Sequence, residues 1–191
     1  MKREATEDAP RVPRVLVPFA DGTEEMEVVI IVDVLRRAGC DVVLASPGGL
    51  AATCSRGVVI SPDADLEDQQ VDNFDALVIP GGGPGTERLA ASPKMLQLVR
   101  SFHAVEKVLG AICAGPLVLQ AAGVLQERDF TCHPSVAADL PARLKQRVVV
   151  DGHLYTSQGP GTAMAFTLAL VAALQGPEVV KNVAAPLILP R

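Results

Sequence analysis

The stretch VLGAICAGP, residues 108–116, carries the pattern that decides the fold. A run of small and apolar residues of strand length leads directly into Cys113, and a helical pattern begins just after it. A strand, a nucleophile and a helix in succession form a crowded elbow, which requires small residues two positions before and two positions after the nucleophile. Ala111 and Gly115 meet that requirement. The stretch therefore predicts a strand-to-helix elbow with Cys113 at its tip.

Outward from the elbow, apolar segments of strand length alternate with helical patterns along the chain. We expect strands over residues 14–19, 41–46, 75–80, 107–112 and 130–132, a hairpin over 148–156, and helices over 23–38, 92–105, 114–122 and 163–174. The glycine-rich segment 81–85 is predicted to be a turn. This alternation is typical of an α/β protein, a layered sandwich with a mostly parallel sheet and helices on both faces.

The composition is that of one globular domain and excludes several other classes. With 191 residues the chain is long enough to bury a full core. A net charge of -5, with no Trp and no long run of Lys or Arg, argues against nucleic acid as a main partner. We divide the chain into a disordered lead-in, residues 1–12, which lacks the apolar core of a signal peptide, and a single domain, residues 13–191.

The apolar run and the cysteines indicate the compartment. The longest apolar run, residues 163–174, is far shorter than the roughly 20 residues that span a bilayer, so no membrane partner is expected. The four cysteines are far apart and form no C-x-x-C pair, which disfavours a metal site and suits the reducing cytosol. We therefore expect a cytoplasmic protein without a bound metal.

Cys113 is the candidate nucleophile. Backbone N–H groups and the dipole at the start of the following helix favour a thiolate, so the elbow predicts a lowered thiol pKa. The alternative is a buried structural cysteine, which is the commoner fate of this residue type.

Glu27 is the second informative position. Helical spacing places it on one face with Ile31, Val34 and Ala38, in a helix that Thr23 is predicted to cap. Burial on this apolar face would raise the pKa of the carboxyl, and a protonated carboxyl can donate a hydrogen bond to a thiolate or shuttle protons. The alternative is that Glu27 belongs to an acidic first turn that stabilises the helix end.

Two further features lie where strand ends meet loops. His133, after the short strand 130–132, is a candidate base or substrate contact, against the alternative of a packing or surface histidine. The glycines of residues 81–85 lack the G-x-G-x-x-G spacing of a dinucleotide site, but their backbone N–H groups can line an oxyanion hole.

Taken together, six segments resemble the ThiJ/PfpI superfamily, in particular its branch of the Parkinsonism-associated protein deglycase. The segments are residues 21–27, 32–39, 54–56, 77–82, 111–116 and 158–162. The resemblance spans about residues 15–189. It implies a flavodoxin-like three-layer sandwich, a homodimer, a small aldehyde as substrate and no cofactor.

The resemblance also implies roles for individual residues. Cys113 would be an oxidisable nucleophile that is hydrogen-bonded to a protonated Glu27, with His133 lining the site. The other implied site residues are Gly82 and Ala114, whose backbone amides would bind an oxyanion, and Asp33 and Arg56, which would support the dimer and the oxidised cysteine.

Three positions depart from relatives, the first being Ser61, which stands where some relatives carry a second oxidisable cysteine near the dimer contact. Ala114 stands where relatives proposed to be proteases carry a histidine, so an adjacent Cys–His dyad is missing and hydrolysis of peptides or amides is disfavoured. Gln158 stands where some relatives carry an arginine.

Two functions follow as expectations, and both need the same two residues. The first is a glutathione-independent glyoxalase or protein deglycase that acts on 2-oxoaldehydes through Cys113, with Glu27 as the proton shuttle. The alternative is an oxidative-stress sensor and redox-regulated chaperone, whose useful state is the sulfinic acid of Cys113.

Overall fold

The computed structural model describes residues 11–189, so residues 1–10 of the expected disordered lead-in lie outside the described residues. The strands are β1 (Arg14–Pro18), β2 (Asp41–Ser46), β3 (Ala52–Thr53), β4 (Val59–Ile60), β5 (Ala64–Asp65), β6 (Ala76–Ile79), β7 (Val108–Ile112), β8 (Val148–Asp151) and β9 (Leu154–Ser157). The helices are α1 (Glu25–Arg37), α2 (Gly83–Ala91), α3 (Pro93–Ala104), α4 (Pro116–Ala121), α5 (Ala163–Gln175) and α6 (Pro177–Ala184).

Seven strands form one sheet in the order β5-β2-β1-β6-β7-β9-β8. All neighbouring strands run parallel except β8, which pairs antiparallel with β9 as the predicted hairpin. The short strands β3 and β4 pair with each other in a second sheet. Because β6 and β7 are parallel neighbours, their carboxyl ends meet at the same edge, and the elbow lies there.

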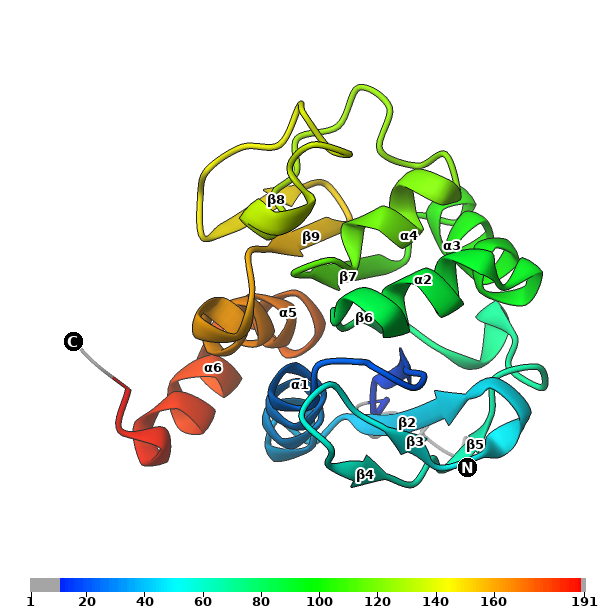
Figure 1. The fold of residues 1–191 in the computed structure, drawn as a ribbon. Coiled ribbons are helices and arrows are strands. Elements are labelled where there is room, and N and C mark those ends of the chain that lie inside the picture. Colours follow the sequence, from blue (N-terminus) through cyan, green and yellow to red (C-terminus); the bar gives the residue numbers. More distant parts are fainter. Residues whose placement is uncertain (1–10, 190–191) are drawn as a thin grey trace, which may run out of the picture.

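Helices cover both faces of the main sheet (Figure 1). Helices α1, α5 and α6 pack together on one face, and α2, α3 and α4 on the other. Strand β1 shows why the sheet is buried on both sides: Val15 and Val17 enter one hydrophobic core, while Leu16 enters the other. The predicted three-layer α/β architecture with a mostly parallel sheet is therefore confirmed. No helix among residues 11–189 is both long enough and apolar enough to cross a membrane.

Three local predictions are wrong in detail. Thr23 does not cap α1: its Oγ1 accepts a hydrogen bond from the Ala20 N–H at 3.0 Å in the preceding turn, and the helix begins at Glu25. The segment 81–85 is not only a turn, because α2 begins at Gly83. Its glycines and proline gave no helical signal, since both have low helix propensity. The expected strand 130–132 reduces to a single parallel bridge between Thr131 and Leu144.

Candidate active site

Cys113 lies in the tight turn between β7 and α4, as predicted. Its φ of 63° is in the left-handed region, which a residue with a side chain adopts only when its surroundings hold it there. The Cys113 N–H donates to the Ser157 carbonyl at 3.0 Å, and the Cys113 carbonyl accepts from the His133 N–H at 2.9 Å. A Cβ at Gly115 would lie 2.8 Å from the Ile112 carbonyl oxygen, so the elbow requires a glycine at this position. The side chain of Cys113 is partly exposed.

Glu27 is fully buried on the inner face of α1, as the helical pattern predicts. Its Oε2 accepts a hydrogen bond from the Gly81 N–H at 2.7 Å. Its Oε1 is buried and has no nitrogen or oxygen partner among the described residues. Burial raises the pKa of Glu27 to about 7, against the opposing effects of the Gly81 amide and of the neighbouring Cys113 thiol. The carboxyl can therefore give and take a proton near neutral pH.

Two backbone amides favour the ionised form of the Cys113 sulfur. They belong to Gly82 and Ala114, the two residues expected to form an oxyanion-binding pair, and both lower the pKa of the thiol. Gly81 lets these segments approach each other, since a Cβ there would lie 2.5 Å from the Cys113 Cβ and 2.9 Å from Glu27 Oε2. The structure therefore brings four predicted site residues together around one sulfur atom. The sequence places Gly81 among glycines whose N–H groups can line an oxyanion hole, but its N–H donates to Glu27 and its missing Cβ makes room for Cys113.

The expected lowering of the Cys113 pKa is contradicted. Burial and the negative charge of Glu27 raise the pKa of the thiol to about 12, and the two amides offset these effects only in part. The second cause acts only while Glu27 is ionised. Protonation of Glu27 removes this negative charge and leaves a carboxyl that can donate a hydrogen bond to the sulfur. Because the two groups titrate as a pair, the site gains one negative charge as the pH rises through neutrality and resists a second.

His133 lines a hollow beside the nucleophile and does not bond to the sulfur. Its Nδ1 accepts a hydrogen bond from the Ser135 N–H at 3.1 Å, which places the proton of the neutral ring on Nε2. The ring packs against Gly159, where a Cβ would lie 3.1 Å from the His133 Cδ2. The hollow has a volume of about 220 Å³ and is lined by His133, Pro134 and residues 158–162.

Comparisons with known proteins agree with this geometry. The model of the DJ-1/PfpI family matches residues 13–173. The chain belongs to the DJ-1/PfpI family.

Relatives match the chain over most of its length. The Parkinson disease protein 7 homolog of Danio rerio is 42% identical, over 92% of this chain and 97% of that protein. The glutathione-independent glyoxalase DJR-1.2 of Caenorhabditis elegans is 39% identical, over 92% of this chain and 95% of that protein. The chain covers only 39% of the Arabidopsis thaliana protein DJ-1 homolog B, which is 41% identical.

A solved structure supports the same assignment. The crystal structure of Drosophila melanogaster DJ-1beta superimposes with a TM-score of 0.91 at 40% identity, covering 95% of this chain and all of that one. The resemblance and the flavodoxin-like fold expected from the sequence are therefore confirmed.

Two residues that the DJ-1/PfpI resemblance assigned to dimer support lie on the surface. Asp33 pairs with Arg37 one helical turn away. Arg56 donates from its backbone N–H to Glu25 at 2.8 Å and from its side chain to the Ser55 carbonyl at 3.2 Å. Among the described residues, no hydrogen bond joins either of them to Cys113. Their expected roles stay predictions.

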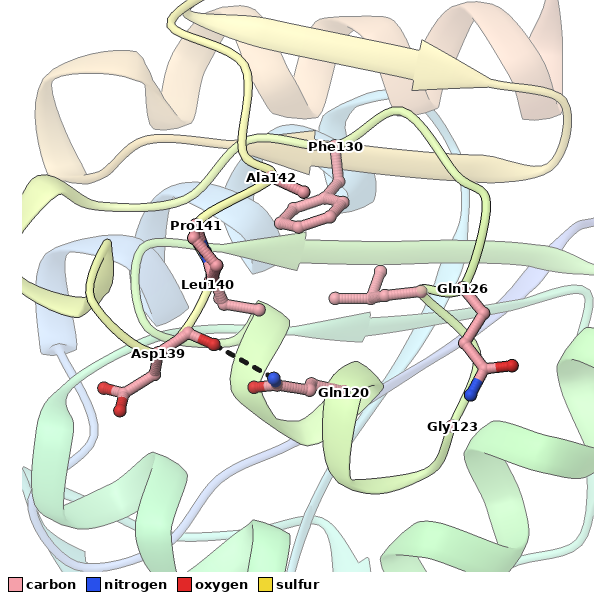
Figure 2. Close-up of a pocket in the computed structure, with 9 residues that line it drawn as sticks. Gln120, Gly123, Gln126, Phe130, Asp139, Leu140, Pro141 and Ala142 are labelled. Carbon is pink, nitrogen blue, oxygen red and sulfur yellow. Dashed lines mark hydrogen bonds between the residues drawn. The ribbon is translucent and has the colours of Figure 1, made fainter.

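A second hollow lies at the carboxyl end of α4, away from the elbow. It has a volume of about 280 Å³ and is lined by apolar side chains together with the polar Gln120, Gln126 and Asp139 (Figure 2). The Gln120 amide donates to the Asp139 carbonyl at 3.0 Å. None of the predicted site residues lines this hollow. Within residues 11–189, no cluster of three or more His, Cys, Asp or Glu side chains is arranged to hold a metal ion.

Replacing Glu27 with glutamine tests the coupling inside the pair. Glu27→Gln removes the charge that opposes thiolate formation and keeps a donor beside the sulfur, so the pKa of Cys113 should fall by about one unit or more. The measurement is the rate of iodoacetamide labelling of Cys113 between pH 6 and 10, read by mass spectrometry. Glu87→Gln, an exposed change on α2, should leave the profile unchanged. An unchanged or higher midpoint in Glu27→Gln would contradict the coupling.

Proposed function

We propose that this member of the DJ-1/PfpI family is a glutathione-independent glyoxalase acting on small 2-oxoaldehydes such as methylglyoxal and glyoxal. The observation that carries the proposal is the pairing of a buried Glu27, whose pKa is about 7, with the Cys113 sulfur at the elbow. The name of the Caenorhabditis elegans relative supports the same activity. The reducing cytosol is the proposed compartment, because the four cysteines are all free thiols.

The reaction begins when the proton of the Cys113–Glu27 pair resides on the carboxyl and the sulfur attacks the aldehyde carbon. A C–S bond forms, and Glu27 gives its proton to the former aldehyde oxygen to yield a hemithioacetal. The Gly82 and Ala114 amides, which face the sulfur, stabilise negative charge that moves from sulfur to oxygen.

Glu27 is then a carboxylate and can act as the base. It removes the proton from the former aldehyde carbon while the neighbouring ketone oxygen gains a proton, which gives an enediol. Return of the first proton to the neighbouring carbon and loss of the hydroxyl proton from the former aldehyde carbon then give the thioester of a hydroxy acid. Water cleaves the C–S bond, which releases lactate from methylglyoxal and restores Cys113. One carbon is oxidised and its neighbour is reduced by the same two electrons, so the scheme needs no metal, glutathione or external oxidant. Early glycation adducts of proteins are a related substrate class, since they share the same aldehyde-derived carbons.

Lactate formation from methylglyoxal, after chelation of metals and without added thiols, tests this proposal. Cys113→Ala should lower kcat/KM by at least about 100-fold, because no other group forms the covalent intermediate. Cys40→Ala, which removes a buried thiol distant in sequence from the elbow, should retain activity within about twofold. Normal turnover by Cys113→Ala, or dependence on glutathione, would overturn the assignment.

A second candidate function is redox sensing with chaperone activity. It is favoured by one contrast: Cys113 is partly exposed, whereas Cys40, Cys54 and Cys132 are buried. Access of peroxide to the sulfur, together with the two amides that face it, would allow oxidation to a sulfinate and would hold its oxygens.

Intact-mass measurement under mild peroxide tests the sensor. We expect a gain of two oxygen atoms that localises to Cys113, and no such gain in Cys113→Ala. Oxidation of the other three thiols before Cys113 would rule out a dedicated sensor.

We also propose that the protein is a homodimer, as the family resemblance implies. The outer face of α1 and the neighbouring strand β4 expose Met26, Val29 and Val59 to between 55 and 64%. A mainly apolar hollow of about 250 Å³ lies between them and includes Asp33 among its lining residues. Exposed apolar patches of this kind are typical of protein interfaces.

Sedimentation velocity tests the dimer. Val29→Glu would bury an unpaired charge at the proposed interface and should raise the dissociation constant of the dimer by about 100-fold or more. Val105→Glu changes an equally exposed valine at the end of α3 and should leave the dimer intact. A monomeric wild-type protein at micromolar concentration would contradict the proposal.

A further inference from the structure

The hollow beside Cys113 is suited to part of a substrate that lies next to the reacting aldehyde. Its walls reach the elbow through two hydrogen bonds: His133 donates to the Cys113 carbonyl, and Cys113 donates to the carbonyl of Ser157, which precedes Gln158. The volume of about 220 Å³ exceeds what a three-carbon aldehyde needs. None of the lining residues is acidic. The hollow therefore has room for a substituent and no carboxylate to repel a negative one.

One cationic side chain is held at the rim of this hollow, and the backbone of a second basic residue lies next to it. Arg147 donates from Nη2 to the carbonyl of Gly161, a lining residue, at 2.8 Å. Lys145 is held next to the hollow because its carbonyl accepts from the Gln158 side chain at 3.0 Å. The Ser157 hydroxyl donates to the Arg147 carbonyl at 2.8 Å, which ties this segment to the end of β9. The first of these contacts places the guanidinium of Arg147 at the rim, and the other two hold the backbone of residues 145–147 against residues 157–158.

Neither cation is neutralised by the protein. Within residues 11–189, the salt bridges involve other basic residues, and neither Lys145 nor Arg147 takes part in one. Arg147 donates one of its five N–H groups to the Gly161 carbonyl and is exposed, so its other N–H groups are available to a ligand. In a chain with a net charge of -5, an unpaired Lys and Arg at one rim form a local positive field.

We infer that the hollow binds a carboxylate or phosphate group carried by the substrate, with Arg147 as the residue that determines specificity and Lys145 as a supporting charge. The preferred substrates would be anionic 2-oxoaldehydes of about five carbons or of equivalent length. This inference rests on the proposed glyoxalase function for the reaction itself. The hollow at the end of α4 provides a contrast, because its lining residues include the acidic Asp139, whereas none of the residues that line the hollow beside Cys113 is acidic.

A pair of substrates of similar length gives the first test. The anionic probe is 4,5-dioxopentanoate and the neutral one is 2-oxopentanal. In each, addition of one water oxidises the aldehyde to a carboxylate and reduces the neighbouring ketone to an alcohol. Arg147→Gln should lower kcat/KM for the anionic probe by about five- to tenfold and leave the neutral probe within about twofold. Arg147→Lys should restore part of the preference, since it keeps the charge and loses the planar fork.

Alkylation of Cys113 gives a second test that does not depend on turnover. Iodoacetate and iodoacetamide differ in charge and react at the same thiolate, so the ratio of their rate constants reports anion recruitment independently of the thiol pKa. Arg147→Gln should lower this ratio by about fivefold at low salt, and about 0.5 M salt should remove most of the difference. Inorganic phosphate should slow iodoacetate more than iodoacetamide, whereas acetate would be the stronger competitor if the site is specific for carboxylates.

Arg100→Gln is the matched control. Arg100 is also exposed and also donates to one backbone carbonyl, that of Ala122, so the change in net charge is the same. Arg100→Gln should leave unchanged the relative kcat/KM for the anionic and neutral probes. It should also leave unchanged the ratio of the iodoacetate and iodoacetamide rate constants. An equal loss with anionic and neutral probes in Arg147→Gln would show that Arg147 only supports the turn at residues 158–162, and an unchanged ratio would exclude the anion site. Absence of lactate formation by the wild type would refute the glyoxalase proposal alone, because the alkylation ratio still decides the anion site.

Discussion

The site depends on the close approach of backbone segments at the carboxyl ends of β6 and β7. These strands are paired in register, with Ile79 opposite Ala111, so the residues that follow them are forced together. Gly81 leaves room for the Cys113 side chain, and Gly82 leaves room for the chain that leads into α1. Any side chain at these two positions would separate Glu27 from the sulfur. The chemistry therefore rests on the absence of two Cβ atoms as much as on the reactive groups.

This packing also explains why the site stabilises one charge and not two. Glu27 is buried beside the partly exposed Cys113, and the charge of Glu27 raises the cost of ionising the thiol, whereas the neutral thiol favours the ionised carboxylate. The backbone amides of Gly81, Gly82 and Ala114 compensate for one negative charge, which can reside on oxygen or on sulfur. A proton that moves between the two groups changes the reactivity of the sulfur while the total charge stays the same. Such a pair suits a reaction in which protons move and no net charge is transferred.

Much of this could be predicted from the sequence because it depends on local patterns. Alternating apolar segments predicted the parallel sheet, small neighbours predicted the elbow at Cys113, and helical spacing predicted the buried face of Glu27. The helix α2 could not be predicted in the same way, because Gly83, Pro84 and Gly85 are poor helix formers and tertiary packing overrides their propensity.

The pKa of Cys113 required the folded structure. The direction of its shift depends on how deeply the sulfur is buried and on the Glu27 carboxylate, 86 residues earlier, which together outweigh the backbone amides of Gly82 and Ala114. The hollow beside the nucleophile and the cations at its rim were also invisible in the sequence, since side-chain contacts between residues 145–147 and 158–161 define them.

The left-handed backbone at Cys113 has a consequence for folding as well as for reactivity. A residue with a side chain held at such a φ costs of order 1 kcal/mol or more, whereas glycine adopts the same conformation freely. At position 113, the residue that best stabilises the fold therefore differs from the residue that supplies the thiol. Mutation to glycine would stabilise the fold and remove the proposed nucleophile. Selection for thermal stability alone would therefore act against the nucleophile, so a library screened for stability at this position needs a parallel screen for the thiol.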